Sequence, residues 1–457
     1  MDSPSIAVFD LLPDEDVVGI LSKIENLNDL FSLCRTSTRI DKICQDRTFW
    51  KNKYKQDFGD KYLPEGDLKL PYIIRTKSKE SNLLSAGYDH AGMVDKNGIL
   101  YMWGNNTQGQ LGDGTTTSRE EPVKILFESK IICISCGFKY TAAVTEKGEV
   151  FTWGLLFDKP EKVDIPSKII KISLGYGFSG RSIAALSEDG LVYHWKSGNP
   201  TPLSTPIKMI DIAVRSDQVS YLSMISEDMK LYHSITDSEN VTMAAKFSII
   251  EKTIPEPILS ISTSYHYTGV LSISGNVYLF GKNYSGQLGT GHPGLIDSKT
   301  GLYDIGMSTN DLNKISLLSP IILLSCRHST TSVITLDNKL YMWGSNLGNK
   351  IFIEKDPILV NKTYHELYPK GYFLAGNDVN QPPSFNIEIS DRIVRNVGSR
   401  RQPILTVDDT TTIEFPSLAV STQIDIGYSV MSISTGENFS IAKTTDSQLN
   451  QWGKQPY

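Results

Sequence analysis

A phrase that recurs along most of this chain constrains its fold more than any other feature. Its fullest copy lies in residues 87–112 and contains Leu100-Tyr101-Met102-Trp103-Gly104, followed by Gly109-Gln110-Leu111-Gly112. Shorter copies end at Trp153-Gly154, Phe280-Gly281, Trp343-Gly344 and Trp452-Gly453. A structural unit that recurs roughly every 40 to 50 residues is typical of blades arranged around a ring.

Each copy is an apolar run, a polar turn and a second apolar run that ends in an aromatic residue, which predicts a β-hairpin. The copies align at Trp103, Trp153, Trp195, Ser234, Phe280, Trp343, Phe415 and Trp452. The copies that end at Ser234 and Phe415 are the weakest. Their turns contain Asp228-Met229 and Asp409-Thr410 where an Asn-Gly or Asp-Gly pair is usual. An aromatic residue that recurs in every blade is expected to pack between blades, so Trp103 and its equivalents are predicted to be structural.

The segment from Trp103 to Gly112 resembles the RCC1 repeat, and residues 280–289 repeat it with Phe280 in place of tryptophan. The resemblance covers residues 81–457, and the family forms a seven-bladed β-propeller. It therefore implies a mostly β fold built as a propeller of this kind. Because eight hairpins align, either one weak copy is not a blade or the ring has eight blades.

Residues 1–60 show a helical period instead. Val17, Ile20, Leu21 and Ile24 fall on one face of a helix, Asn28-Asp29 offers a second helix cap, and a third stretch leads to Trp50. Three short amphipathic helices cannot bury all of their apolar surface by themselves. Such a unit often docks on a partner.

This α-helical stretch resembles an F-box. The matching residues are Leu12-Pro13, Ile20-Leu21, Leu27 with Leu30 and Leu33, Cys34-Arg35 and Trp50-Lys51. The resemblance implies binding to the Skp1 adaptor and, through it, to a cullin-RING ubiquitin ligase. The residues expected to contact Skp1 are Leu12, Pro13, Ile20, Leu21, Leu30 and Leu33, whereas Trp50 is expected to lie partly in the core. The alternative is a helical cap of another kind, since any small helical bundle shares this apolar spacing.

Residues 61–80 are interpreted as a linker. Within them, residues 70–75 resemble a short strand that begins with a proline, as at Glu121-Pro122 and Asp356-Pro357. The last copy of the phrase ends at Trp452-Gly453 and is followed by four residues, so its blade lacks an outer strand. We therefore expect residues 70–75 to supply that strand and close the ring.

Charge and composition narrow the compartment and the partners. A net charge of -6 makes nucleic acid and anionic membranes unlikely partners. The first residues lack the basic start and apolar core of a signal peptide, and no apolar run has the roughly 20 residues of a membrane helix. Five cysteines, an odd number, fit a reducing compartment better than a disulfide framework. These features predict a protein of the cytoplasm or nucleus of a eukaryotic cell, or of the host if the chain is viral.

Three motifs imitate ligand sites. The Gly-x-Gly-x-x-Gly pattern at residues 175–180 binds dinucleotides only where a helix follows, and hairpin strands are expected here. Cys133 and Cys136 have the spacing of half a zinc site without a second pair, so core packing is favoured. His90, His266 and His328 align at one repeat position, which favours a scaffold role. No catalytic residue, cofactor or metal ligand is predicted.

Two insertions, near residues 291–319 and 345–390, interrupt the repeats, and insertions of this kind map to loops that often bind partners. Their aromatic residues Tyr303, Tyr364, Tyr368, Tyr372 and Phe373 are candidate contacts for a protein. The alternative is that these aromatics pack back on the ring. Arg392, Arg395, Arg400 and Arg401 form a basic cluster that is either solvated or a docking site for acidic partners.

Together these features predict a non-catalytic substrate-recognition adaptor of an SCF-type (Skp1-cullin-F-box) ubiquitin ligase, in which the F-box binds Skp1 and the propeller binds an unknown target protein. The alternative is a guanine-nucleotide exchange factor or regulator of a small GTPase, a role that the RCC1 resemblance also implies.

Overall fold

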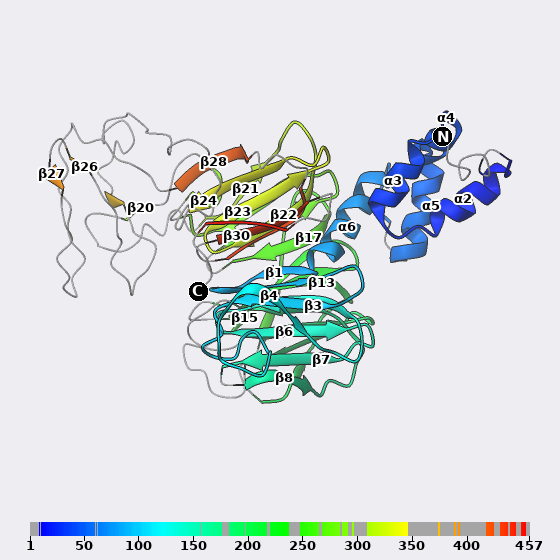
Figure 1. Cartoon of the computed structure of the whole chain (residues 1–457). Coiled ribbons are helices and arrows are strands. Elements are labelled where there is room, and N and C mark those ends of the chain that lie inside the picture. Colours follow the sequence, from blue (N-terminus) through cyan, green and yellow to red (C-terminus); the bar gives the residue numbers. More distant parts are fainter. Residues whose placement is uncertain are drawn as a thin grey trace.

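The computed structural model of the chain consists of a head of helices and a ring of β-sheets, with helix α6 between them (Figure 1). It describes residues 9, 11–59, 61, 63–155, 157–175, 182–196, 198–216, 220–236, 247–264, 267–283, 286–290, 295–296, 309–345, 373–374, 388–389, 392–393, 417–424, 430–436, 439–444 and 449–453. No helix within these residues is both long and apolar enough to cross a membrane.

Four short helices form the head: α2 (Asp14–Ser22), α3 (Leu27–Cys34), α4 (Thr38–Gln45) and α5 (Arg47–Phe58). The sequence predicted three, and the fourth arises because Asp46 is extended and its carboxylate accepts a hydrogen bond from the N–H of Thr48, which caps α5. The cap of α3 is Asn26 and not the predicted Asn28-Asp29.

Residues 70–75 belong to a helix, so the prediction of a ring-closing strand was wrong. Helix α6 spans Lys69–Ser81, and Pro71 lies in its first turn, where a missing N–H breaks no hydrogen bond within the helix. Tyr72, Ile73, Ile74 and Ser78 are buried, as expected for a helix that packs on the head with one side and on the ring with another. A proline before apolar residues fits both a strand start and a first helical turn, which explains the error.

Among the described residues, seven antiparallel sheets make up the ring, six with four strands and the last with three. The first three blades are β1 (Leu84–Ala86), β2 (His90–Val94), β3 (Leu100–Gly104), β4 (Arg119–Ile125); β5 (Ile131–Cys136), β6 (Tyr140–Thr145), β7 (Val150–Gly154), β8 (Phe157–Val163); and β9 (Ile169–Leu174), β10 (Ile183–Ser187), β11 (Val192–Trp195), β12 (Thr201–Leu203).

The other four blades follow in chain order. They are β13 (Met209–Ser216), β14 (Ser220–Ser226), β15 (Leu231–Thr236), β16 (Phe247–Lys252); β17 (Ile258–Thr263), β18 (Tyr267–Ser272), β19 (Val277–Gly281), β21 (Thr309–Ile315); β22 (Ile321–Arg327), β23 (Thr330–Thr335), β24 (Leu340–Ser345), β28 (Ser417–Ile424); and β29 (Val430–Thr435), β30 (Phe439–Thr444), β31 (Leu449–Gly453).

The ring is therefore a seven-bladed β-propeller, which settles the choice between seven and eight blades. The copy assigned to Phe415 is not a separate blade, because β28 directly after it pairs with β24 as the outer strand of the sixth blade. Phe415 itself lies outside the described residues. The weak copy at Ser234 is a true blade, and its turn has Met229 at a φ of 63° where the first, second, third and fifth blades have glycine and the sixth has Asn338.

The recurring phrase joins each blade to the next. The backbone carbonyl of Gln110, in the first blade, accepts hydrogen bonds from Trp153 Nε1 (2.9 Å) and Thr141 Oγ1 (2.8 Å) of the second. The same arrangement recurs at Gln287, whose carbonyl accepts from Trp343 Nε1 (3.0 Å) and Thr331 Oγ1 (2.7 Å). Trp153 and Trp343 are fully buried, which supports the structural role predicted for these tryptophans.

Serine side chains link the inner strands around the axis. Serine occupies one matching position on six of the seven inner strands, at Ser85, Ser135, Ser173, Ser262, Ser325 and Ser434. Where the hydrogen bond is described, the serine oxygen accepts from a backbone N–H of the next blade, as Ser85 does from Cys136 (2.9 Å).

The same bond closes the ring, because Ser434 Oγ accepts from the N–H of Ala86 (2.9 Å). Trp103 Nε1 also donates to Gln451 Oε1 (2.8 Å) across this junction, where Phe439 and Ile441 are buried against the first blade. Side chains of the first and last blades therefore join the two ends of the ring.

The predicted insertions lie between the third and outer strands of the fifth and sixth blades. A two-stranded sheet of β20 (Leu295–Ile296) and β25 (Phe373–Leu374) joins them. A second pairs β26 (Glu388–Ile389) with β27 (Arg392–Ile393).

Candidate binding site on the helical head

Arg39 of α4 holds the loop before α2 through several hydrogen bonds. The guanidinium donates to the backbone carbonyls of Leu12 (2.5 Å) and Phe9 (3.1 Å) and to the Asp14 carboxylate (2.7 Å). With its carbonyls turned toward Arg39, the loop leaves Leu11 85% exposed. A fixed loop that displays a large apolar side chain is suited to packing against a partner.

The six residues predicted to contact Skp1 divide into two groups. Leu21 and Leu30 have no exposed surface and pack inside the head, so they support the site without offering a direct contact. Pro13 and Ile20 are exposed, and Leu12 and Leu33 are partly buried. The sequence pattern did not distinguish these groups, because one apolar period serves both the core and the surface.

The core of the head is organised around Trp50. Its indole is 1% exposed and packs against Phe49 and Tyr72, with ring centroids 5.1 Å and 5.4 Å away. Its Nε1 donates to the carbonyl of Cys44 (2.7 Å), which fixes the end of α4. The core role expected for Trp50 is confirmed.

A buried cation ties α5 and α6 to the turn after α2. Lys53 is 1% exposed, and its ammonium donates to the carbonyl of Ser22 (2.8 Å) and to Asp57 (3.2 Å). Tyr72 donates its hydroxyl to the same carboxylate (2.7 Å). Burial and this hydrogen bond to Asp57 raise the pKa of Tyr72.

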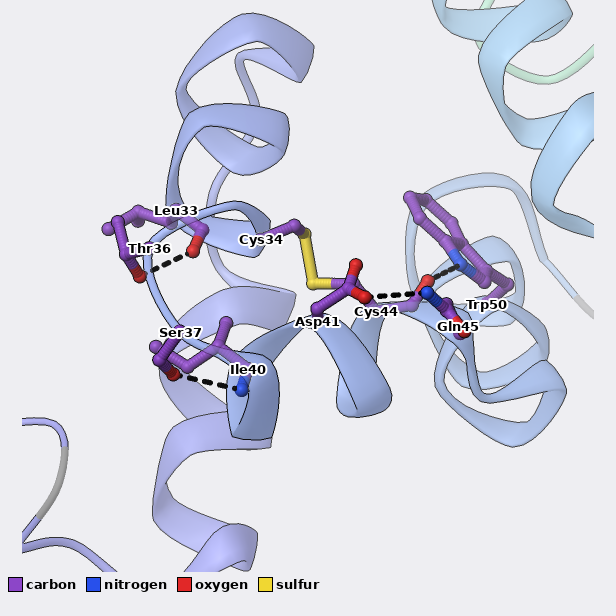
Figure 2. Close-up of a disulfide and its surroundings, with 9 residues drawn as sticks. All are labelled: Leu33, Cys34, Thr36, Ser37, Ile40, Asp41, Cys44, Gln45 and Trp50. Carbon is purple, nitrogen blue, oxygen red and sulfur yellow. Dashed lines mark hydrogen bonds between the residues drawn. A yellow bond between two sulfur atoms is a disulfide. The ribbon is translucent and has the colours of Figure 1, made fainter.

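A disulfide joins Cys34 at the end of α3 to Cys44 of α4 (Figure 2). The odd number of cysteines favoured a reducing compartment over a disulfide framework, and this pairing was not predicted, because a separation of ten residues does not by itself bring two cysteines together. The two cysteines come together because α4 packs back along α3 after the turn at residues 35–37.

The predicted aromatic contacts in the insertions remain predictions. Tyr303, Tyr364, Tyr368 and Tyr372 lie outside the described residues. Phe373 is in β25, where its backbone pairs with Ile296. Of the basic cluster, Arg392 lies in β27, and Arg395, Arg400 and Arg401 lie outside the described residues.

The motifs that imitate ligand sites belong to the scaffold. After Gly175 the described chain resumes with strand β10, so the glycine pattern is not followed there by the helix that a dinucleotide site requires. Cys133 and Cys136 pack in different clusters on opposite faces of their sheet, so they do not form a chelating pair.

The predicted alignment of the histidines was wrong. His90 pairs with Gly104, and the matching position of the sixth blade, opposite Gly344, is Thr330 and not His328. His266 lies outside the described residues. His90 is fully buried, and its Nε2 lies 2.9 Å from Thr141 Oγ1, a contact within the scaffold.

A cavity of about 90 Å³ lies on the axis of the ring, lined by all seven inner strands and, at one end, by Ser78 and Ser81 of α6. A volume of this size holds a few water molecules, whereas small-molecule sites usually occupy at least about 300 Å³. The cavity is therefore smaller than usual small-molecule sites, and the exposed apolar loop of the head is the better candidate for a binding site.

Comparison with known proteins identifies the repeats. Models of the regulator of chromosome condensation (RCC1) repeat match residues 97–144 and 83–110. The chain is 24% identical over 325 residues to the regulator of chromosome condensation of Drosophila melanogaster, which covers 61% of this chain and 57% of that protein. It is 25% identical over 343 residues to the human X-linked retinitis pigmentosa GTPase regulator, covering 66% and 31%. Neither alignment reaches two thirds of the relative.

Among solved structures, Prp20p from Saccharomyces cerevisiae has a similar fold. The TM-score is 0.54 at 16% identity, over 79% of this chain and 81% of that one. The class of the ring is thus defined: it is an RCC1-like propeller made of RCC1 repeats.

Proposed function

We propose that the chain is a substrate-recognition adaptor of an SCF-type ubiquitin ligase. In this proposal the head binds a Skp1-like adaptor, which joins it to a cullin-RING ligase, and the propeller binds a target protein. The observation that carries the proposal is the loop held by Arg39, which leaves Leu11 and Pro13 exposed, as is Ile20 in the helix that follows. Figure 1 shows α2 at the end of the head that faces away from the ring, which leaves the ring free for a second partner.

An adaptor of this kind acts without a catalytic step of its own. It raises the effective concentration of a target beside the charged enzyme, so its requirements are two separate binding surfaces and a firm connection between them. Helix α6 supplies that connection, because head residues and ring residues belong to one continuous apolar cluster that includes Ile74, Leu259 and Ile322.

A pull-down of the full chain with co-expressed Skp1 tests the proposal. The intact chain should bind, and Leu12→Ala combined with Pro13→Ala should abolish binding. Leu11→Ser is a sharper variant, because its side chain is 85% exposed and its loss removes no core packing. Leu126→Ala is the matched control, since this leucine is 79% exposed but lies on the ring. Absence of binding by the intact chain, or equal loss with Leu126→Ala, would overturn the proposal.

A second candidate is regulation of a small GTPase through the propeller. It is favoured by the similarity of the ring to a protein named as a GTPase regulator. Nucleotide release measured across a panel of small GTPases tests it, and acceleration that persists in the Leu11→Ser variant would favour this function over the adaptor. No acceleration with any member of the panel would count against it.

A further inference from the structure

The cross-link between Cys34 and Cys44 acts on the helix that holds the exposed loop. The two Cα atoms lie 5.8 Å apart, within the range that a disulfide spans without backbone movement. Cys34 is the last residue of α3 and is followed by the exposed Arg35 and Thr36, so a small opening of this turn gives a reagent access to it.

Helix α4 connects the cross-link to the loop. At its C-terminal end Cys44 is bonded to Cys34, and its carbonyl accepts from Trp50 Nε1 (2.7 Å) (Figure 2). At its N-terminal end Arg39 donates to the carbonyl of Leu12 (2.5 Å). The helix has only eight residues, so movement of one end displaces the other. Loss of the cross-link should therefore loosen the loop that displays Leu11.

The other three cysteines are poor substrates for the same chemistry. Cys133, Cys136 and Cys326 are buried within the sheets of the ring. Burial raises the pKa of Cys133 to about 11 and that of Cys326 to about 12, which keeps both as unreactive thiols. Cys34 and Cys44 are also buried (5% and 2% exposed), but Cys34 ends a short helix beside an exposed turn, whereas the ring cysteines lie within strands of packed sheets.

We propose that Cys34 and Cys44 form a reversible thiol–disulfide exchange site for a low-molecular-weight disulfide such as oxidised glutathione. One cysteine thiolate attacks a sulfur of the small disulfide and releases one thiol, and the second cysteine then displaces the other. Two protein thiols and one small disulfide thereby become one protein disulfide and two small thiols. The oxidised state holds α4, and through Arg39 the loop, in the binding conformation; this consequence for binding rests on the proposed adaptor function.

The first test counts thiols in the full chain after equilibration with oxidised or reduced glutathione. With a thiol reagent under denaturing conditions, the reduced chain should show all five cysteines of the sequence. The oxidised chain should show only the three ring cysteines, with peptide mapping that links Cys34 to Cys44. Five free thiols in both states, or a different pairing, would overturn the proposal.

Hydrogen exchange then measures the effect on α4. Closing a loop of this length changes a local opening equilibrium by about a hundredfold on chain-entropy grounds, so reduction should speed exchange of the α4 amides by about that factor. Strand β6 of the ring is the internal control and should not change. Equal exchange of α4 in both redox states would contradict the coupling, and this readout does not depend on any partner.

Binding completes the test. Reduction should weaken Skp1 binding by about fivefold or more, as expected when a binding loop loses its pre-organisation. In the double variant Cys34→Ala, Cys44→Ala, glutathione should have no effect on affinity. Absence of Skp1 binding in both states would overturn the adaptor function. Equal Skp1 binding in the oxidised and reduced states would overturn only the proposed effect of the disulfide on binding.

Discussion

The role of the recurring phrase predicts a large difference between two glycine substitutions, Gly112→Ala and Gly198→Ala. Both glycines have a φ of 77°, a conformation that costs a residue with a side chain about 1–2 kcal/mol. A Cβ at Gly198 would meet nothing within 4 Å. A Cβ at Gly112 would lie 2.7 Å from Nε1 of Trp153, so the two variants share the backbone cost and differ in packing.

The packing cost follows from the surroundings of Trp153. The indole is 1% exposed, so it has little room to shift, and overpacking of a core typically costs about 1–3 kcal/mol. Any shift also strains its hydrogen bond to the carbonyl of Gln110 (2.9 Å), and a buried donor without its acceptor costs a further 1–3 kcal/mol or so. We therefore expect about 1–2 kcal/mol for Gly198→Ala and about 3–8 kcal/mol for Gly112→Ala.

Urea unfolding followed by tryptophan fluorescence measures the difference as a shift of the midpoint at constant slope. Gly289→Ala provides a repeat of the experiment in the fifth blade, because its Cβ would lie 3.0 Å from Nε1 of Trp343. Its effect should fall between the other two. Equal destabilisation by Gly112→Ala and Gly198→Ala would refute the idea that this glycine is required by the tryptophan of the next blade.

Three further predictions concern buried polar groups. Burial lowers the pKa of His194 to about 4 from an unfolded value of about 6.5, and the positive charge of Lys196 adds a smaller effect in the same direction. The contribution of the neutral His194 to stability is therefore complete above pH 6.5 and is lost as the pH falls toward 4. The free energy of unfolding relative to His194→Gln should fall by about 3 kcal/mol over that interval in urea titrations. Asp211→Ala should lower the free energy of unfolding by about 3–5 kcal/mol, because it leaves the mostly buried charge of Lys171 without its ion-pair partner. Adding Lys171→Met should recover most of this loss in the same assay. Trp50→Phe should destabilise the head by about 1–3 kcal/mol and speed exchange of the α4 amides, because the carbonyl of Cys44 loses its donor.

The hairpins could be predicted from the sequence because their signals are local. An apolar run, a turn and an aromatic-glycine pair lie within about 20 residues, and the alternation of a strand is short-ranged. The number of blades could not be predicted from these local signals. Strand β28 pairs with β24 across an insertion of more than 70 residues, and no local pattern reveals such a pairing. The closing junction was missed for a similar reason: Ser434 and Ala86 are 348 residues apart.

In the head, the sequence predicted which residues are apolar but not which of them face outward. Leu21 and Ile20 are neighbours, yet one is buried and the other is 39% exposed, because only the packing of α2 on α4 and α5 decides the orientation. Arg39 carried no signal in the pattern, since an arginine at the start of a helix is usually solvated. Its partners are carbonyls that any loop possesses, so its role depends on where the loop lies.

Helix α6 determines how the two candidate binding surfaces relate to each other. If it were a flexible tether, a partner on the ring would sample many positions relative to the head. Instead Ser78 lies 3.0 Å from Ser260 of the fifth blade, Lys61 pairs with Glu227 of the fourth, and Asn28 of α3 contacts Met431 of the seventh. Contacts to three blades from α3, from the segment between α5 and α6, and from α6 itself resist rotation about the helix. In the proposed adaptor, a target bound to the ring would therefore be presented to a partner bound to the head in one orientation, as transfer between the two would require.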